Sequence, residues 1–475
     1  MNSTPCDILV IGGGFAGLSV VRALQKSNKY NQSSIVLLEA SNRFGGRMKT
    51  QYSSKGTTNR CPDVQFECGA WRIPSKHTRM HMLIQSLNDE IEEAEDHIQL
   101  IPAPQKGSTN KKGTKHTKTH QRNPYLSKFG AELAQFSSVE LKDNDRSGVL
   151  LQAISDERAG GYSGVWSQAN VNTNNLSYHT VDGDTFKVPK AGFSQLIHTL
   201  VTSTKKHLPV AKLIKRSLVC DIHKVCPDDS SSKGAGYRVT TLTRGESLVF
   251  FCNTIIVACP PGATKDWVNY ASMTTLHRSL VRTHPLCHIY AKYNPGERPT
   301  GNNGEPTHQV FQDSIIQQIS SSPYPNSRFH QVSYSAGRLA TFWHRLYLAN
   351  PIRCLRTLRE AMGDIGRDSN FSSIRVCYWP NAIHMFRGGM AFDLQKVVSS
   401  AIHPNPFLLE GVYHVGEAFS SHQGWGEGCL ETIDLLMEHL KKAERPIPSG
   451  GVVTSLPVLV FNGRIINLTK SWLQR

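Results

Sequence analysis

Three glycines near the amino terminus have the spacing of a turn that binds a dinucleotide pyrophosphate. They follow the apolar run at residues 8–11 and precede a stretch with helical apolar spacing. Gly12 permits a tight turn, Gly14 lets backbone approach a pyrophosphate, and Gly17 lets a helix pack closely on a strand. The phosphates would lie at the helix N-terminus, where free N–H groups and the helix dipole favour anions. The residues predicted to contact the cofactor here are Gly12, Gly14, Phe15, Ala16 and Gly17.

Such a turn needs a strand before it and a helix after it. The apolar runs at residues 8–11 and 35–38 are typical of buried strands, and residues 18–26 have helical spacing. The order strand, glycine turn, helix, strand predicts a βαβ unit. Glu39 ends the second strand where an acidic side chain accepts hydrogen bonds from a ribose diol, and Ala40 follows it as a further predicted contact. A glycine turn without a ligand is the alternative interpretation.

A second glycine pair indicates which dinucleotide is bound. Gly45 and Gly46 are flanked by Arg43 and Arg47. A bulky cofactor can lie against such bare backbone while the arginines meet phosphate or flavin oxygens. A nicotinamide-dependent dehydrogenase has no need of this loop, which resembles the second glycine motif of the flavin-dependent amine oxidases. A surface turn with two solvated arginines is the alternative.

A third motif lies near the carboxyl terminus. Residues 413–418 are typical of a strand that runs into a loop, residues 422–428 are rich in glycine, and residues 429–440 have helical apolar spacing. The segment resembles the closing flavin motif of the amine oxidases, and together with the first two motifs it predicts FAD as the cofactor. The residues predicted to contact FAD here are Gly416, Glu417, Gly424, Trp425, Gly426 and Thr432.

The family resemblance implies a fold of the α/β class (α+β overall). Residues 217–222 look like the strand that covers the adenine, with Val219 as a backbone contact, and residues 254–261 look like the strand and turn that leave the cofactor domain. The expected parts are a discontinuous Rossmann-like FAD-binding domain (1–75, 205–270 and 396–443), a mostly helical lobe (76–185), a mixed-sheet substrate domain (186–204 and 271–395) and a tail (444–475).

The segment at residues 66–74 bears on the substrate. Backbone at Gly69 and Ala70 would approach the flavin, and Trp71 and Arg72 are further predicted cofactor contacts. An arginine presents a planar fork that matches a carboxylate. The run Gly-Ala-Trp-Arg resembles the L-amino acid oxidase branch of the family, which implies that Arg72 holds the substrate α-carboxylate. A structural arginine paired with an acid is the alternative.

Three more residues are predicted to bind the substrate. Residues 332–343 resemble a strand of the substrate domain, in which Tyr334 would give its hydroxyl to the same carboxylate. A buried core tyrosine is the alternative. Gly424 would offer its carbonyl to the substrate amino group, and Trp425 would form a wall of the pocket.

The resemblance implies oxidative deamination of an L-amino acid. A hydride would pass from the substrate α-carbon to the flavin, the imino acid would hydrolyse to a 2-oxo acid and ammonia, and O2 would become hydrogen peroxide. The protein's part is binding and orientation. Three alternatives stay open: a monoamine or polyamine oxidase, an amino-acid oxidative decarboxylase (monooxygenase), and a catalytically silent flavin-binding interaction protein.

One position departs from the family pattern. Many relatives carry a lysine, hydrogen-bonded to a water near the flavin, on a strand that matches residues 285–293 here. The matching residue is His288, which is the candidate catalytic residue, and Lys292 lies four residues further on. A satisfied core histidine is the alternative.

Composition limits the other classes of partner. The 475 residues carry 53 Lys and Arg against 37 Asp and Glu, a formal charge of +16. The basic loop at residues 104–130 has seven Lys or Arg but few aromatics, which disfavours a nucleic-acid arm. None of the 11 cysteines has metal-site spacing, so we expect no metal. The tail, with a hairpin pattern around Asn462 and Gly463, has no assigned role.

The expected location is the cytoplasm. Residues 1–5 lead directly into an apolar strand without the charged and apolar regions of a signal peptide, and no apolar run is long enough to span a membrane. The final residues do not form a peroxisomal signal. We therefore expect small-molecule partners, an L-amino acid and O2, without a membrane or nucleic acid, and a homodimer is compatible with the sequence.

Overall fold

The computed structural model describes most of the chain outside one long internal segment. The described residues are 3–53, 63–104, 185–207, 211–225, 236–267, 270, 274–299, 308–310, 314–364, 367, 369–386, 394–404, 409–442, 459–461 and 464–466. The predicted helical lobe and basic loop therefore lie largely outside the described residues, as does most of the tail.

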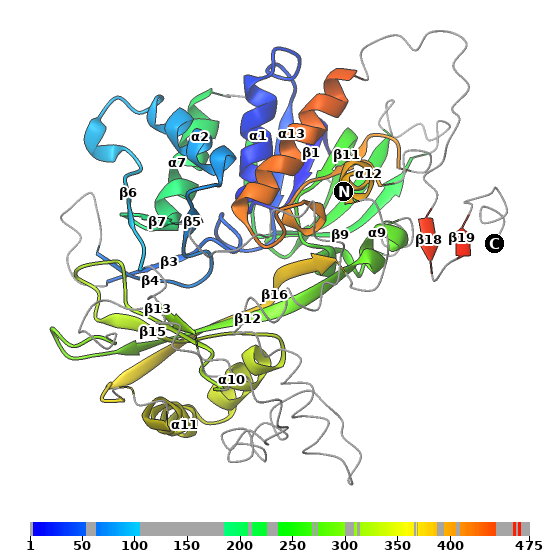
Figure 1. Ribbon diagram of the computed structural model, residues 1–475. Helices are drawn as coiled ribbons and strands as arrows, with labels where there is room; N and C mark the ends of the chain where they lie inside the picture. Colours follow the sequence, from blue (N-terminus) through cyan, green and yellow to red (C-terminus); the bar gives the residue numbers. More distant parts are fainter. Residues whose placement is uncertain are drawn as a thin grey trace.

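A seven-stranded sheet forms one half of the molecule (Figure 1). Its order is β8-β2-β1-β11-β10-β9, with β17 also paired to β11. β8, β2, β1, β11 and β17 pair parallel to one another, whereas β10 is antiparallel to both of its neighbours, β11 and β9. The bounds are β1 Ser3–Ile11, β2 Ile35–Glu39, β8 Lys212–Lys215, β9 Ser217–Lys224, β10 Tyr237–Thr243, β11 Glu246–Val257 and β17 Val412–His414.

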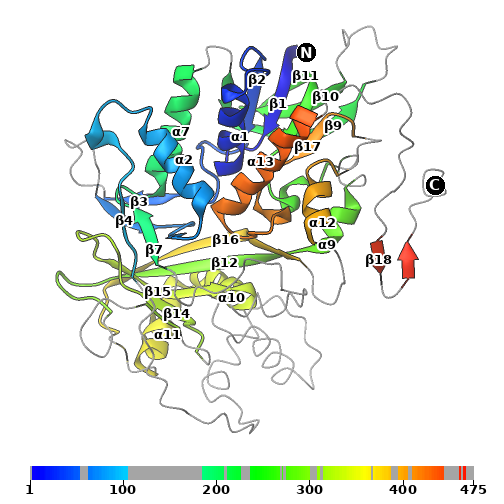
Figure 2. The ribbon, with the colours of Figure 1, turned by 45° about the horizontal axis from the view of Figure 1, so that its top comes forward.

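Alternate residues of strand β1 pack on the two opposite faces of this sheet, because successive side chains of a strand point to opposite sides. Ile8 and Val10 belong to a core shared with the helices, whereas Leu9 and Ile11 belong to the core on the other face. The helices on the first face are visible in Figure 2. They are α1 Phe15–Lys26, α2 Thr78–Asn88, α7 Phe193–His207 and α13 Gly426–Lys442.

A five-stranded sheet, in the order β13-β14-β15-β12-β16, forms the other half (Figures 1 and 2). Cys287 and Ile289 of β12 pack with helices α10 and α11, so His288 between them faces the opposite way. His288 is the register partner of Tyr334 on β15 and of Cys377 on β16. The bounds are β12 Val281–Lys292, β13 His308–Val310, β14 Gln318–Ser320, β15 Phe329–Ala336, β16 Ser373–Phe386, α10 Gly337–Ala349 and α11 Pro351–Asp364.

One predicted strand is wrong over half its length. Residues 332–343 were expected to be a strand, but β15 ends at Ala336 and helix α10 begins at Gly337. Gly337 has φ of 62°, a left-handed conformation that turns the chain and that glycine adopts readily. The following Leu339, Phe342 and Trp343 are buried at helical spacing.

Short elements lie between the two large sheets (Figure 1). The bounds of the two small sheets are β3 Thr50–Tyr52 with β4 Val64–Glu67, and β5 Ile73–Pro74 with β6 Leu100–Pro102 and β7 Phe186–Pro189. The other helices in the described part of the chain are α9 Thr275–Leu280, α12 Leu394–Ala401 and the short 3-10 helices at Ala94–Asp96, Pro261–Thr264 and Glu417–Phe419. In the tail, β18 Leu459–Phe461 pairs antiparallel with β19 Arg464–Ile466.

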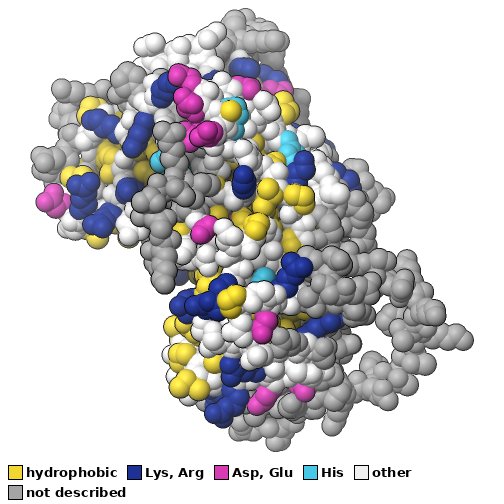
Figure 3. All heavy atoms as spheres, turned by 90° about the vertical axis from the view of Figure 1, so that its left-hand side faces the viewer, with side chains coloured by type: hydrophobic (Ala, Val, Ile, Leu, Met, Phe, Trp, Pro, Cys, Tyr) yellow, Lys and Arg dark blue, Asp and Glu magenta, His cyan; other side chains and the backbone are white. Residues whose placement is uncertain are grey.

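The positively charged side chains are dispersed over the surface rather than gathered in one patch. On the face shown in Figure 3, Lys and Arg side chains form several separate groups, with Asp and Glu among them. Within the described residues, no helix has the length and apolar character needed to cross a membrane. The same residues contain no cluster of His, Cys, Asp or Glu arranged to hold a metal ion.

Candidate active site

The first glycine turn has the tight geometry that its spacing predicts. Gly12 has φ of 110°, and its N–H donates to the Leu38 carbonyl at 2.8 Å. A Cβ atom on Gly17 would lie 1.8 Å from the Gly12 carbonyl oxygen. Only glycine at position 17 therefore lets helix α1 approach the end of β1 this closely.

Helix α1 begins with backbone groups that suit an anion. No side chain caps its N-terminus at Gly14, so its first N–H groups can face a ligand. A Cβ atom on Gly14 would meet only Gly46 backbone, at 3.7 Å and beyond. The Glu39 carboxylate closes the neighbouring side of the turn, because it accepts from Gly13 N–H at 2.8 Å and from Ser41 N–H at 2.9 Å.

The second glycine pair contacts the first turn directly. Gly45 N–H donates to the Gly13 carbonyl at 2.8 Å, and Gly14 and Gly45 form an isolated parallel bridge. Arg43 is half-buried, and its guanidinium donates to the carbonyl oxygens of Phe44, Gly46 and Met48. Arg43 therefore holds the shape of this loop from within, and burial lowers its pKa.

A buried carboxylate joins the second motif to the third. Glu417 Oε1 lies 2.6 Å from Arg47 NH1 and 2.6 Å from His384 Nδ1, and Glu417 Oε2 accepts from Gly424 N–H at 2.7 Å. His384 and Arg47 together hold the pKa of Glu417 at about 2, despite its burial. Arg47 also donates to the Ala382 carbonyl at 2.5 Å.

The helix of the third motif, α13, begins three residues earlier than the sequence predicts. The predicted helix at 429–440 begins at Gly426, so Gly426, Glu427 and Gly428 form its first turn. Thr432 accepts a hydrogen bond from Gly416 N–H at 2.9 Å, and Gly416 has φ of 138°. Two of the predicted contact residues, Gly416 and Thr432, thus fix each other's position.

The segment before Arg72 lies against the same loop. Ala70 N–H donates to the Arg47 carbonyl at 3.0 Å, and a Cβ on Gly69 would lie 1.8 Å from that oxygen. Trp379 of β16 donates from Nε1 to the Cys68 carbonyl at 2.5 Å. Trp379 was not predicted, because its partner lies 311 residues away in the sequence.

These residues fit FAD. A bare glycine backbone, an uncapped helix start, an acidic side chain at the end of β2 and two glycine-rich loops meet in one place. Val219 on β9 is buried, and its carbonyl accepts from Trp267 Nε1 at 3.0 Å. Its predicted contact with adenine stays a prediction, as do the individual roles of the other residues.

The residues predicted to bind the substrate gather next to this place. The Arg72 guanidinium lies 4.1 Å from the centre of the Phe186 ring and 4.5 Å from that of Trp71. Trp425 packs in the cluster that contains Phe186, and its ring centre is 4.9 Å from that of His77. Burial holds the pKa of His77 at about 3, so this histidine is neutral.

Tyr334 and His288 adjoin this group. The Tyr334 and Trp71 ring centres are 6.3 Å apart, and those of Tyr334 and His288 are 4.6 Å apart with edge-on geometry. Burial raises the pKa of Tyr334, while the Arg72 charge acts in the opposite direction. Burial also holds the pKa of His288 at about 3, so His288 is a neutral imidazole.

His288 makes its hydrogen bonds through Nδ1. The Gln331 amide nitrogen lies 3.0 Å from Nδ1, and the Tyr290 hydroxyl oxygen lies 3.3 Å from it. Tyr290 donates its own hydroxyl proton to the Glu67 carbonyl at 2.6 Å. The buried His288 Nε2 has no hydrogen-bond partner among the described residues.

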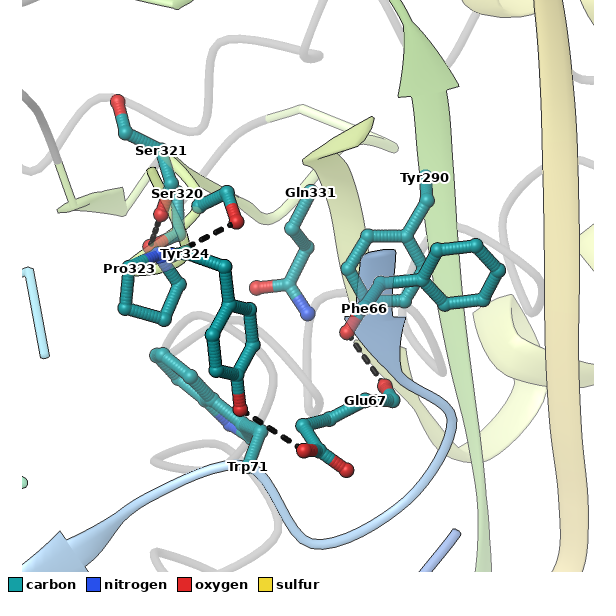
Figure 4. Close-up of a pocket in the computed structure, with 10 residues that line it drawn as sticks. Phe66, Glu67, Trp71, Tyr290, Ser320, Ser321, Pro323, Tyr324 and Gln331 are labelled. Atoms are coloured by element: carbon teal, nitrogen blue, oxygen red, sulfur yellow. Dashed lines mark hydrogen bonds between the residues drawn. The ribbon is translucent and has the colours of Figure 1, made fainter. Parts of the chain in front are cut away.

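A small cavity of about 20 Å³ lies beside this network (Figure 4). Glu67, Trp71, Tyr324 and Gln331 are among the residues that line it. The Glu67 carboxyl group accepts from Tyr324 OH at 2.8 Å, from Phe193 N–H at 3.0 Å and from Thr50. Burial nevertheless raises the pKa of Glu67 to about 7. Sequence reasoning missed Glu67, although a glutamate directly after an apolar strand residue was a signal.

Comparison with known protein sequences extends the interpretation of the amino-terminal region. A family model described as an NAD(P)-binding Rossmann-like domain matches residues 10–87. Polyamine oxidase 5 from Oryza sativa subsp. japonica is 40% identical over 52 residues, which are 11% of this chain and 10% of the rice protein. The match thus spans about a tenth of the length of that relative.

Solved structures match over nearly the whole chain. A double mutant of putrescine oxidase has a TM-score of 0.60 at 12% identity and covers 93% of this chain and 100% of its own. Cyclohexylamine oxidase from Brevibacterium oxydans IH-35A has a TM-score of 0.59 at 15% identity, with coverage of 93% and 100%. A protein from Exiguobacterium sp. 255-15, assigned as a protoporphyrinogen oxidase, has a TM-score of 0.57 at 14% identity, with coverage of 94% and 100%.

The fold and the glycine turns define a protein with a Rossmann-like dinucleotide-binding fold. More specifically, this chain has the fold of the flavin-dependent amine oxidases. The predicted α/β fold class is confirmed, and FAD is the cofactor that this fold and the residues of the site indicate.

Proposed function

We propose that this chain is an FAD-dependent oxidoreductase that oxidises the CH–NH2 group of an L-amino acid. The products would be a 2-oxo acid, ammonia and hydrogen peroxide. Bound FAD supplies the hydride acceptor, and O2 is the final electron acceptor. The chain's own residues bind the substrate, orient its α-carbon and exclude water from it.

The position of Arg72 carries this proposal. Its guanidinium lies over two aromatic rings and close enough to Tyr334 for its charge to oppose the rise in that side chain's pKa caused by burial. A cation in that place attracts a carboxylate and repels an ammonium group. An α-amino acid brings both groups, so Arg72 can fix its carboxylate while its amino group points away. A simple amine gains nothing from such a cation.

His288 contributes a neutral hydrogen-bonding group. Its Nε2 is buried, has no partner among the described residues and lies on the face of β12 that it shares with Tyr334. We assign His288 Nε2 to hold a water by hydrogen bonding. Because its pKa is about 3, it holds no positive charge at neutral pH, unlike a lysine at the same position.

A second candidate function is the oxidation of a carboxylate-free amine. The names of the structural neighbours, putrescine oxidase and cyclohexylamine oxidase, and of the rice polyamine oxidase favour it. In that case Arg72 would have a structural role between Trp71 and Phe186.

One substrate panel separates the two candidates. The FAD-loaded protein is assayed for peroxide with the twenty L-amino acids, putrescine and cyclohexylamine. We expect a signal with at least one amino acid, and we expect Arg72→Leu to lower its kcat/KM by about 100-fold or more, because hydrogen bonds to charged groups are lost. Arg238→Leu, at an exposed position on β10, is the matched control and should leave kcat/KM unchanged.

Three outcomes would overturn the proposal. The first is peroxide from the amines alone, with Arg72→Leu as active as the parent. The second is release of CO2 and an amide, which indicates an oxidative decarboxylase. The third is a bound flavin that stays oxidised with every compound under nitrogen, which indicates a binding protein without this catalytic activity.

A further inference from the structure

Two free thiols lie next to the Gly69–Ala70 backbone, which contacts the second glycine loop at Arg47. Cys68 precedes Gly69, and Cys377 is on β16 as the register partner of His288. Both side chains belong to one packed cluster with Phe66 and Tyr290, and they are hydrogen-bonded to each other. The strand carrying Cys377 also carries Trp379, which holds the Cys68 carbonyl.

We propose that Cys68 and Cys377 form a peroxide-sensitive dithiol, which closes to a disulfide beside the Gly69–Ala70 backbone. This inference rests on the proposed function only for the source of the oxidant, a hydroperoxide. Neither thiol has a role in the proposed oxidation of the substrate.

The surroundings of the pair determine which of the two thiols reacts first with the peroxide. The hydrogen bond from Cys377, together with the positive charges of Lys49 and Arg43, lowers the pKa of Cys68. The same contact with Cys68, reinforced by burial, raises the pKa of Cys377. A thiolate is the nucleophile toward peroxides, so Cys68 reacts first. Cys68 itself is buried, whereas the neighbouring Cys377 is partly exposed, so a molecule the size of hydrogen peroxide would reach Cys68 past Cys377.

The chemistry balances with one peroxide. The Cys68 thiolate attacks one peroxide oxygen, the O–O bond breaks, and the leaving hydroxide takes a proton to become water. The product is a sulfenic acid at Cys68. The Cys377 thiol then attacks that sulfur, a second water leaves, and the disulfide closes. Two thiols are oxidised and one peroxide is reduced to two waters.

A second thiol pair in the chain serves as an internal control. Cys6 and Cys252 are register partners on β1 and β11, are both buried, and are also hydrogen-bonded to each other. As at Cys377, the partner thiol and burial raise the pKa of Cys252, but no positive charge among the described residues acts on it. Proximity is thus matched between the two pairs, while the cationic surroundings and partial exposure belong to Cys68 and Cys377.

The test uses the full chain with added hydrogen peroxide, followed by alkylation of the remaining thiols, digestion and mass spectrometry. We expect a cross-linked peptide containing Cys68 and Cys377, and a fall by two in the number of titratable thiols, reversed by dithiothreitol. Cys6 and Cys252 should stay alkylated. Cys68→Ser should abolish the reaction, whereas Cys377→Ser should leave a sulfenic acid at Cys68 that dimedone traps.

Three results would overturn the proposal. These are full alkylation of Cys68 and Cys377 after peroxide, equal cross-linking of Cys6 with Cys252, and further oxidation of Cys68 in the parent protein without a cross-link. Because peroxide is added, the thiol result does not depend on turnover. A chain that forms the disulfide but oxidises no amino acid would retain this proposal and lose the proposed function. A chain that oxidises an amino acid but forms no disulfide would do the opposite.

Discussion

At the scale of single residues, two buried glutamates behave in opposite ways. Glu417 has two cationic or polar partners and a backbone N–H, and its pKa lies at about 2. Glu67 has hydroxyl and N–H donors but no cationic hydrogen-bond partner among the described residues, and burial raises its pKa to about 7. A buried carboxyl group therefore keeps its charge at neutral pH only where an opposite charge offsets the loss of hydration.

We expect Glu417→Gln to destabilise the protein by about 3 kcal/mol, because removal of one partner leaves the other charge buried without compensation. The folded pKa of Glu417 is below its usual value of 4.5, so its contribution is fully present above pH 4.5 and is lost as the pH falls toward about 2. Urea unfolding at several pH values measures this. A variant with the parent's acid sensitivity would contradict it.

Glu67→Gln should act in the opposite direction. The folded pKa is raised from 4.5 to about 7, so stability is fully present below pH 4.5 and is lost as the pH rises toward 7. One pKa unit corresponds to about 1.4 kcal/mol, so the variant should gain up to about 3 kcal/mol over the parent by pH 8. The difference between the two unfolding free energies, followed from pH 4 to 8, should grow with pH. A constant difference would show that Glu67 does not titrate in the folded state.

At the scale of elements, the sequence was sufficient where the signal is local. Gly12, Gly14 and Gly17 lie within six residues, and their spacing alone specifies a strand, a turn and a helix start. The sequence did not predict the change from strand to helix at Gly337, where a turn interrupts an apolar run. Aromatic and aliphatic residues suit a buried strand and a buried helix equally well.

The glycine turn gives a prediction with a matched pair of variants. Gly14 has φ of −74°, and an added methyl group would meet Gly46 backbone only at 3.7 Å. Gly14→Ala should therefore fold with nearly the parent stability but lose its flavin, because the methyl group occupies the space for the pyrophosphate.

Gly17→Ala should instead unfold more readily, by about 3 kcal/mol or more, because its methyl group would lie 1.8 Å from the Gly12 oxygen. Flavin absorbance of the purified proteins and unfolding of the apo forms separate the two effects. Equal loss of stability in both variants would refute this assignment of the glycines.

At the scale of the whole molecule, the site depends on contacts that no local pattern contains. Glu67 contacts Tyr324 across 257 residues, and Trp379 contacts Cys68 across 311. The partner of each of these residues lies in a distant segment, so the sequence predicted the cofactor loops but neither the buried carboxyl network nor the thiol pair. Strand pairing between distant segments created both.

Cofactor binding should therefore stabilise the molecule as a whole. A ligand that binds only the folded state adds about 2.7 kcal/mol at 100 times its Kd. Addition of FAD to the apo protein should raise the unfolding temperature, and Gly14→Ala should show no such rise. An unfolding temperature that is independent of FAD in the parent protein would contradict the assignment of the cofactor site.

The link between Arg47 and Glu417 spans 370 residues and has a consequence for how the protein is made. A chain is made from its amino terminus, so β1 and β2 can pair before Glu417 has been synthesised, and until then Arg47 lacks this carboxylate. We therefore expect the cofactor loops to take their final positions only after Glu417 has left the ribosome.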